Sequence, residues 1–69
     1  MEDRELLNIF TYHPVKDGQA EKYEELRNRG LDLARDIVRL CPPSRERSVA
    51  ITKLQEVIMF SNASIAIHE

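Results

Sequence analysis

The chain has 69 residues, 42% of them hydrophobic, and a formal net charge of −2. This length predicts a single domain over residues 1–69, near the lower limit at which a hydrophobic core stabilises a fold unaided. One cysteine excludes an intramolecular disulfide, and with two histidines far apart it makes a poor zinc site, so we expect no metal or other cofactor. The composition argues against polymeric nucleic acid as a partner. No apolar run reaches a membrane span, and the start "MEDRE" lacks the basic region of a signal peptide, so we expect a cytoplasmic protein without a membrane partner.

A short helix is predicted over residues 3–10. Leu6, Leu7 and Phe10 fall on one side of this helix, and Asp3 is available as its N-cap. The helix is expected to end before the tyrosine that follows.

Residues 11–18, "TYHPVKDG", are predicted to form an extended loop. Pro14 disfavours helical geometry at His13, and Gly18 indicates a turn. Tyr12 can stack on a nucleobase, and His13 can stack or donate a hydrogen bond. The alternative is that this loop folds back over the rest of the chain and buries Tyr12 with its hydroxyl satisfied.

A long helix is predicted from about Gln19 to Leu40. Gly30 fills a gap in its apolar seam, although glycine costs about 1 kcal/mol of helix propensity relative to alanine. This glycine indicates either the close approach of another helix or a tolerated weak position. The predicted seam consists of Tyr23, Leu26, Leu33, Ile37 and Leu40.

Two prolines, Pro42 and Pro43, end this helix, and Ser44 is the predicted N-cap of a second long helix from about Arg45 to His68. Because the connection is short, the two helices are expected to pack as antiparallel neighbours. The predicted fold is therefore all-α: a short N-terminal helix, a loop and a helical hairpin. The seam of the second helix consists of Ile51, Leu54, Ile58, Ser61 and Ile65.

Beyond its seam, the second long helix is apolar on most of its circumference. Met59 and Phe60 are therefore assigned to a core or an interface rather than to a ligand. A monomeric hairpin cannot bury such a helix on several sides, so we expect an obligate homo-oligomer.

Catalysis is not expected. A nucleophile needs a base and an orienting group, whereas Cys41 lies beside the proline pair and Ser44 has the position of a helix cap. His13 and His68 have no carboxylate at a spacing that would fix it beside them. The sequence therefore favours a binding or interaction protein over an enzyme.

A cluster at the start of the second long helix suits an anion. At 100° per residue, Arg45, Ser48 and Thr52 lie on one stripe that begins at the positive end of the helix. A guanidinium and two hydroxyls there suit a phosphate, and Arg47 lies close by. The alternative is that Arg45 and Arg47 are solvated residues of the first turn and that Ser48 only packs.

Two arginines of the first long helix differ in their expected partners. Arg29 follows Glu25 by four positions, so a surface ion pair is the default. Arg27 has no oppositely charged residue four positions away, which leaves it available to a ligand.

Taken together, the segments "YHPVKDGQAEKYEELR" and "CPPSRERSVAITKLQEVIMFSNASIA" resemble the small phage anti-CBASS proteins, which sequester cyclic oligonucleotide signals. The resemblance extends from about Phe10 to the end of the chain. Its most specific parts are the motif that begins at Tyr12, the segment from Pro43 to Ser48, and the segment from Met59 to Ala66.

The resemblance implies a homohexamer that binds cyclic dinucleotides between protomers and performs no chemistry. It implies ligand contacts by Tyr12, Arg27, Arg45 and Ser48. The other residues of the loop and of the anion cluster complete the predicted set. The predicted ligand residues are Tyr12, His13, Arg27, Arg45, Arg47, Ser48 and Thr52.

Some members of the resembled family also hold cyclic trinucleotides through a basic residue in the C-terminal segment. In this chain Ile67 stands where that arginine is expected, so a trinucleotide pocket is in doubt, with His68 and Arg29 as partial substitutes. Two competing hypotheses stay open. One is an oligomeric hairpin that docks on another protein without a small ligand, and the other is a cyclic-nucleotide phosphodiesterase.

Overall fold

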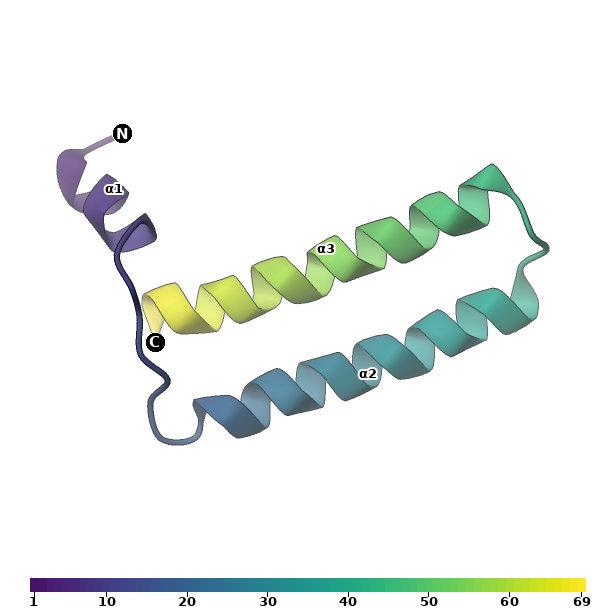
Figure 1. The fold of residues 1–69 in the computed structure, drawn as a ribbon, viewed down its shortest axis with the longest axis horizontal. Helices are drawn as coiled ribbons and strands as arrows, with labels where there is room; N and C mark the ends of the chain where they lie inside the picture. Colours follow the sequence, from purple (N-terminus) through teal and green to yellow (C-terminus); the bar gives the residue numbers. More distant parts are fainter.

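The computed structural model describes residues 1–69 and contains three helices and no strand: α1 (Asp3–Ile9), α2 (Gln19–Leu40) and α3 (Arg45–His68). Helices α2 and α3 run antiparallel as a hairpin, and α1 stands off near its open end (Figure 1). The predicted all-α hairpin is confirmed, including the bounds of both long helices. None of the three helices combines the length and the apolar content that a membrane crossing requires.

The helix ends follow the local chemistry of the sequence with one exception. Ser44 is the N-cap of α3, as predicted, and its hydroxyl accepts a hydrogen bond from the Arg47 amide at 3.1 Å. Gly18 precedes α2 with a φ of 85°, a left-handed conformation that glycine adopts without steric cost. The predicted cap of α1 was wrong: Asp3 lies inside the first turn, and Glu2 is the N-cap without a side-chain hydrogen bond.

The seam of α3 is confirmed, because all five predicted residues are half-buried, whereas the seam of α2 needs a correction. Leu33 and Leu40 are 50% and 68% exposed. At 100° per residue Leu33 lies about 60° around the helix from Gly30, and Ala34 follows the 3.6-residue period more closely. The residues of α2 that face α3 are Tyr23, Leu26, Gly30, Ala34 and Ile37.

Gly30 marks the close approach of the two long helices. It is buried, and a Cβ atom built on it would lie 2.9 Å from Cγ1 and 3.0 Å from Cδ1 of Ile58. Such distances are shorter than normal carbon–carbon contacts. Of the two interpretations of this glycine, the structure therefore supports close packing rather than a tolerated weak position.

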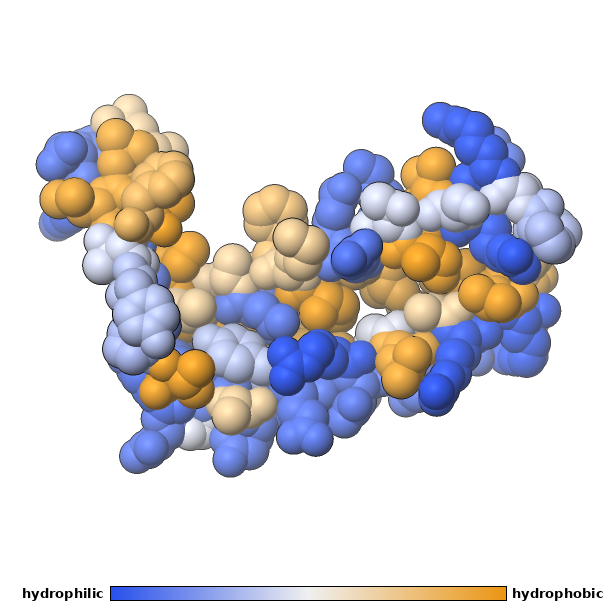
Figure 2. Space-filling view, viewed as in Figure 1, coloured by the Kyte–Doolittle hydropathy of each residue, from blue (hydrophilic) through white to orange (hydrophobic).

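The chain by itself has no hydrophobic core. Only Gln19 and Gly30 are buried, and no hydrophobic side chain is. The accessible surface is 5716 Å², roughly 1,300 Å² more than a folded monomer of this mass usually exposes. The radius of gyration is 15.3 Å, against about 11 Å for a compact domain of this length. Figure 2 shows hydrophobic side chains open to solvent over α1 and along the hairpin.

Candidate functional site

Tyr12 lies in the loop between α1 and α2, and its side chain is not covered by its own chain. The residue is 84% exposed. The alternative interpretation, in which the loop folds back and buries Tyr12, is therefore not realised within one protomer. An exposed ring on this loop is free to stack on a flat partner.

His13 holds the junction between α1 and this loop. Its Nε2 lies 2.6 Å from the carbonyl oxygen of Asn8, so Nε2 carries the hydrogen and donates it, because a carbonyl only accepts. The Asn8 side chain in turn donates to the carbonyl of Ile67 at 3.4 Å. One ring nitrogen of His13 is thus engaged inside the protein, and Nδ1 has no partner in the chain.

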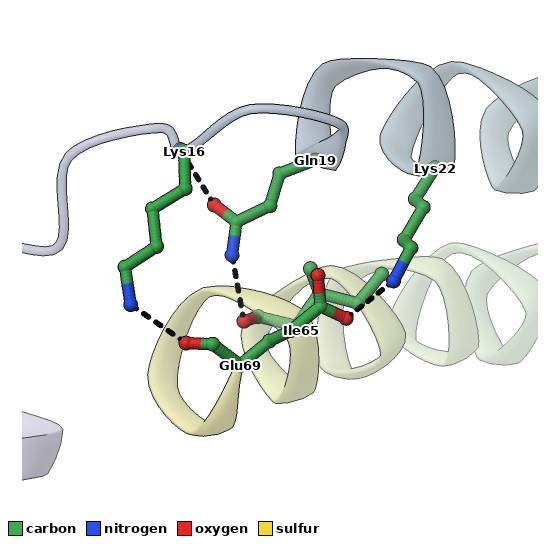
Figure 3. A network of polar contacts seen from close by, with 5 residues as sticks. All are labelled: Lys16, Gln19, Lys22, Ile65 and Glu69. Atoms are coloured by element: carbon green, nitrogen blue, oxygen red, sulfur yellow. Dashed lines mark hydrogen bonds and ion pairs between the residues drawn. The ribbon is translucent and has the colours of Figure 1, made fainter.

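The other end of the loop is held against the last turn of α3 (Figure 3). The Lys16 amide donates to Oε1 of Gln19 at 2.9 Å, and Nε2 of Gln19 donates to the Ile65 carbonyl at 3.4 Å. The Lys16 ammonium donates to the Glu69 carbonyl at 2.7 Å, and the Lys22 ammonium pairs with the Glu69 carboxylate at 2.6 Å. The segment that carries Tyr12 is therefore fixed at both ends while its ring is free.

Arg27 lies on the rim of a groove between α2 and α3. It is exposed and has no ion pair within the chain. The groove has a volume of about 470 Å³, which lies within the usual range for small-molecule sites. Its lining is mostly apolar and consists of Arg27, Gly30, Leu31, Ala34, Ile51, Leu54, Gln55, Ile58, Met59 and Asn62.

The three residues of the predicted stripe line one shallow hollow at the start of α3. Arg45, Ser48 and Thr52 line this hollow together with Val49 and Lys53. A guanidinium, an ammonium and two hydroxyls therefore share one surface near the positive end of a helix, which suits a phosphate.

The cations of this hollow are held only weakly by neighbouring acids. Arg45 lies 3.7 Å from the Glu46 carboxylate, and Lys53 lies 3.5 Å from that of Glu56. Each of these side chains is between 45% and 82% exposed, and exposed ion pairs contribute at most about 1 kcal/mol. Both cations can therefore turn to an incoming anion at small cost.

Arg47 points elsewhere. Its Nη1 donates to the carbonyls of Val38 and Cys41 at 3.4 and 3.2 Å. These carbonyls belong to the last turn of α2 and to its C-cap, which lack intrahelical partners. Arg47 thus stabilises the turn of the hairpin through Nη1, while Nε and Nη2 have no partner within the chain.

One protomer does not bring the predicted ligand residues together. The loop between α1 and α2, which carries Tyr12 and His13, lies near the open end of the hairpin, whereas the start of α3, which carries Arg45 and Ser48, lies by its turn (Figure 1). The chain is 45 Å long in its longest direction. The groove beside Arg27 and the hollow at the start of α3 also share no lining residue. A single small ligand can meet all of them only where chains adjoin.

The residues considered for a second pocket are placed as follows. Arg29 lies 3.8 Å from the Glu25 carboxylate, which confirms the predicted surface ion pair. Ile67 is half-buried and its carbonyl accepts from Asn8, while His68 is exposed. The tail thus presents the His68 imidazole at this end of α3, while the carboxylate of Glu69 is paired with Lys22.

Three residues of these surfaces were not predicted. Lys53 joins the anion hollow because it follows Val49 by one helical turn, and this spacing was readable from the sequence. Asn62 lines the groove, and its Oδ1 is buried without a hydrogen-bond partner; a lone amide in an apolar segment was a usable signal. Gln19 depends on contacts with residues 46 positions away, which no local pattern reveals.

Comparison with known proteins gives one match. The family model described as Acb2/Tad1, hairpin domain, matches residues 2–66, whereas no curated protein and no solved structure matches. The matched family is a sponge or hairpin domain and not a known enzyme family. The match spans all of α1 and α2 and nearly all of α3, so the chain belongs to the Acb2/Tad1 hairpin-domain family, the anti-CBASS sponges.

Proposed function

We propose that this protein binds cyclic dinucleotide second messengers, such as cyclic GMP-AMP, and sequesters them without cleavage in the cytoplasm of an infected bacterium. Removal of the messenger suppresses CBASS-type antiphage signalling. Membership of the anti-CBASS family supports the biological setting. The ligand class is the one that the family resemblance implies, and the chemistry of the exposed side chains supports it.

The observation that carries the proposal is Tyr12, an aromatic ring that is 84% exposed on a loop held at both ends. Stacking of a base on an aromatic ring contributes about 1 to 3 kcal/mol. A ring presented on a fixed loop loses little conformational entropy when it binds, which favours tight sequestration. His13 stands next to it with Nδ1 available.

The phosphates of the ligand are assigned to the exposed cations. Arg27 on the groove rim and Arg45, Ser48 and Thr52 in the hollow offer the charged and hydroxyl donors that phosphate prefers. Because these groups and Tyr12 are separated within one chain, we assign the ligand to a site between protomers. A cyclic dinucleotide has two bases and two phosphates, so protomers related by a twofold axis can each supply one set.

A homo-oligomer, with six copies as in the resembled family, completes this proposal. The absence of any buried hydrophobic side chain and the surplus surface of roughly 1,300 Å² support it. That surplus exceeds the area of about 800 Å² that each partner of a standard interface buries. Sedimentation velocity tests the assembly, and a stable monomer at micromolar concentration would contradict it.

The experiment that tests the function is calorimetric titration with a panel of cyclic dinucleotides and cyclic trinucleotides. We expect cyclic dinucleotides to bind and to be recovered intact after the complex is denatured by heat; recovery of cleaved ligand would instead indicate a phosphodiesterase. Trinucleotide binding would show that a second pocket persists despite Ile67. No heat of binding across the panel, verified by equilibrium dialysis, contradicts the proposal.

Tyr12→Ala and Tyr12→Phe form a matched pair for this titration. Loss of the ring is expected to weaken binding about 5- to 150-fold, whereas the phenylalanine variant retains the stacking face and most of the affinity. The melting temperature of both variants should stay close to that of the parent, because Tyr12 is 84% exposed in its own chain. Equal affinity of the alanine variant and the parent would refute the role of Tyr12.

A second candidate function is an oligomeric module that docks on another protein. Phe10 and Phe60 are 83% and 72% exposed, and exposed aromatic side chains are typical of interaction surfaces. A variant in which both are replaced by serine distinguishes the two candidate functions. It does so on the condition that its nucleotide affinity and oligomer size equal those of the parent. A sponge retains its suppression of signalling in cells, whereas a docking module loses it.

A further inference from the structure

Gln19 is the most buried side chain of the protein, with 1% of its surface exposed. Both ends of its amide are engaged: Oε1 accepts from the Lys16 amide at 2.9 Å, and Nε2 donates to the Ile65 carbonyl at 3.4 Å. A buried polar side chain in a chain without buried hydrophobic ones is stable only because its hydrogen bonds are satisfied. Its position is therefore fixed by specific contacts.

The contacts of Gln19 belong to a wider set that involves the last turn of α3. The last carbonyls of a helix have no following turn to accept from, although that of Ile65 still accepts from the Glu69 amide at 3.1 Å. Three side chains donate to backbone oxygens at this end of the chain: Gln19, the first residue of α2, to Ile65; Asn8 of α1 to Ile67; and Lys16 of the loop to Glu69. The end of α3 thus serves as a dock for the loop, as Figure 3 shows for the α2 side.

Tyr12 lies between these attachment points. On one side, Asn8 links the end of α1 to Ile67, and the Asn8 carbonyl also accepts from His13. On the other side, two hydrogen bonds join Lys16 to Gln19. The backbone amide of Lys16 donates to the side chain of Gln19, and the Lys16 carbonyl accepts from the backbone amide of Gln19 at 3.1 Å. Residues 9–15, which include Tyr12, connect these two attachments, and the bond from His13 to the Asn8 carbonyl closes part of that segment, which restricts the movement of Tyr12 relative to α3.

We propose that Gln19 is a positioning residue, which couples the loop that carries Tyr12 to the carboxyl end of α3 and holds the aromatic ring in place for its ligand. The ligand part of this statement rests on the proposed function. The positioning part does not, because it concerns the loop in the absence of any ligand.

We assign this role to Gln19 rather than to the lysines because the lysine contacts are open to solvent, which weakens them. The Lys22 and Glu69 side chains are 53% and 44% exposed, and an ion pair at such a site is weakened by water and salt. The amide of Gln19 is shielded from both. Its loss also removes the donor that α2 supplies to the Ile65 carbonyl, although the backbone amide of Glu69 continues to bond there.

The chain has two tyrosines and no tryptophan. The test therefore uses the Tyr23→Phe variant as the parent, so that the intrinsic fluorescence comes from Tyr12 alone. Gln19→Ala and Gln19→Glu are compared with this parent, and Lys22→Gln is the control that removes the exposed ion pair alone. Three quantities are measured without ligand: amide hydrogen exchange of residues 11–18, fluorescence anisotropy of Tyr12, and helix content by circular dichroism.

We expect Gln19→Ala to accelerate exchange at the Lys16 amide about fivefold or more and to lower the anisotropy of Tyr12, with helix content unchanged. Lys22→Gln should leave both loop readouts at the parent values. Gln19→Glu preserves shape and the acceptor for the Lys16 amide but removes the donor to Ile65. Burial raises the pKa of a carboxyl at this position above the ordinary glutamate value. Acidification should therefore restore a donor there, and the loop of this variant should become as rigid as that of the parent at the same pH.

Unchanged exchange and anisotropy in both Gln19 variants would overturn the proposal. A loop that loosens only in step with loss of helix content would overturn it as well, since Gln19 would then support the fold and not the loop. Binding measurements distinguish a failure of this proposal from a failure of the proposed function. If the parent itself does not bind cyclic dinucleotides, the proposed function alone is refuted. Equal affinity of the parent and Gln19→Ala, with a loosened loop, refutes the role of Gln19 at the ligand.

Discussion

Gly30→Ala tests the close packing of the two long helices. In an open helix this change stabilises by about 1 kcal/mol, because alanine has the higher helix propensity. Here the new methyl group would lie 2.9 Å from Cγ1 of Ile58 and 3.0 Å from its Cδ1, and overpacking of this kind costs about 1 to 3 kcal/mol. The steric cost outweighs or cancels the propensity gain, so the net destabilisation is expected to be about 0 to 2 kcal/mol.

The matched background is Ile58→Ala, which removes both atoms that the new methyl group would meet. In that background Gly30→Ala should stabilise by about 1 kcal/mol, so the double-mutant cycle should give a coupling of about 1 to 3 kcal/mol. Urea unfolding, followed by circular dichroism at one fixed protomer concentration, measures all four proteins. If Gly30→Ala stabilises equally in both backgrounds, the helices do not approach at Gly30 and the reasoning fails.

The remaining predictions concern the start of α3. Arg45→Ala should weaken cyclic dinucleotide binding by about 1.5 to 3 kcal/mol in calorimetry without a change of melting temperature, and unchanged affinity would remove Arg45 from the site. Arg47→Ala should lower the free energy of unfolding by about 1 kcal/mol, because two carbonyls lose their donor. It should also reduce nucleotide affinity less than Arg45→Ala does. A larger loss of affinity in Arg47→Ala would refute the assignment of Arg47 to the turn and of Arg45 to the ligand. Ser44→Ala removes the N-cap of α3 and should cost about 1 kcal/mol in urea unfolding, whereas no loss would show that the cap is replaceable.

The hairpin was predictable because its signals are local. Two prolines end α2, Ser44 begins α3, and Gly18 precedes α2, so the bounds of both long helices follow from residues beside them. The error at Leu33 had a physical cause: the sequence shows which residues are apolar but not which of two adjacent rows meets the other helix. Gly30 and Ala34 decide this, since small side chains let the helices approach and larger ones on that row would keep them apart.

The candidate site was predictable only in its chemistry. The stripe of Arg45, Ser48 and Thr52 follows from helical spacing, and the structure does bring these residues to one hollow. The engagement of Arg47 with the end of α2 depends on the geometry of the turn, which spacing within α3 does not contain. The docking of the loop by Gln19 depends likewise on the end of α3, far along the chain.

The proposed assembly gives the exposed surface of the chain and the separation of its predicted ligand residues a common physical explanation. In the proposed assembly, other chains cover the helices of a protomer that has no buried hydrophobic side chain of its own. The same packing can bring Tyr12 of one chain near Arg27 or Arg45 of another, which one hairpin keeps apart. Assembly would then create stability and the ligand site together, so a ligand between protomers stabilises the oligomer by mass action. Substitutions that weaken the assembly should therefore weaken binding even where they lie far from every ligand residue.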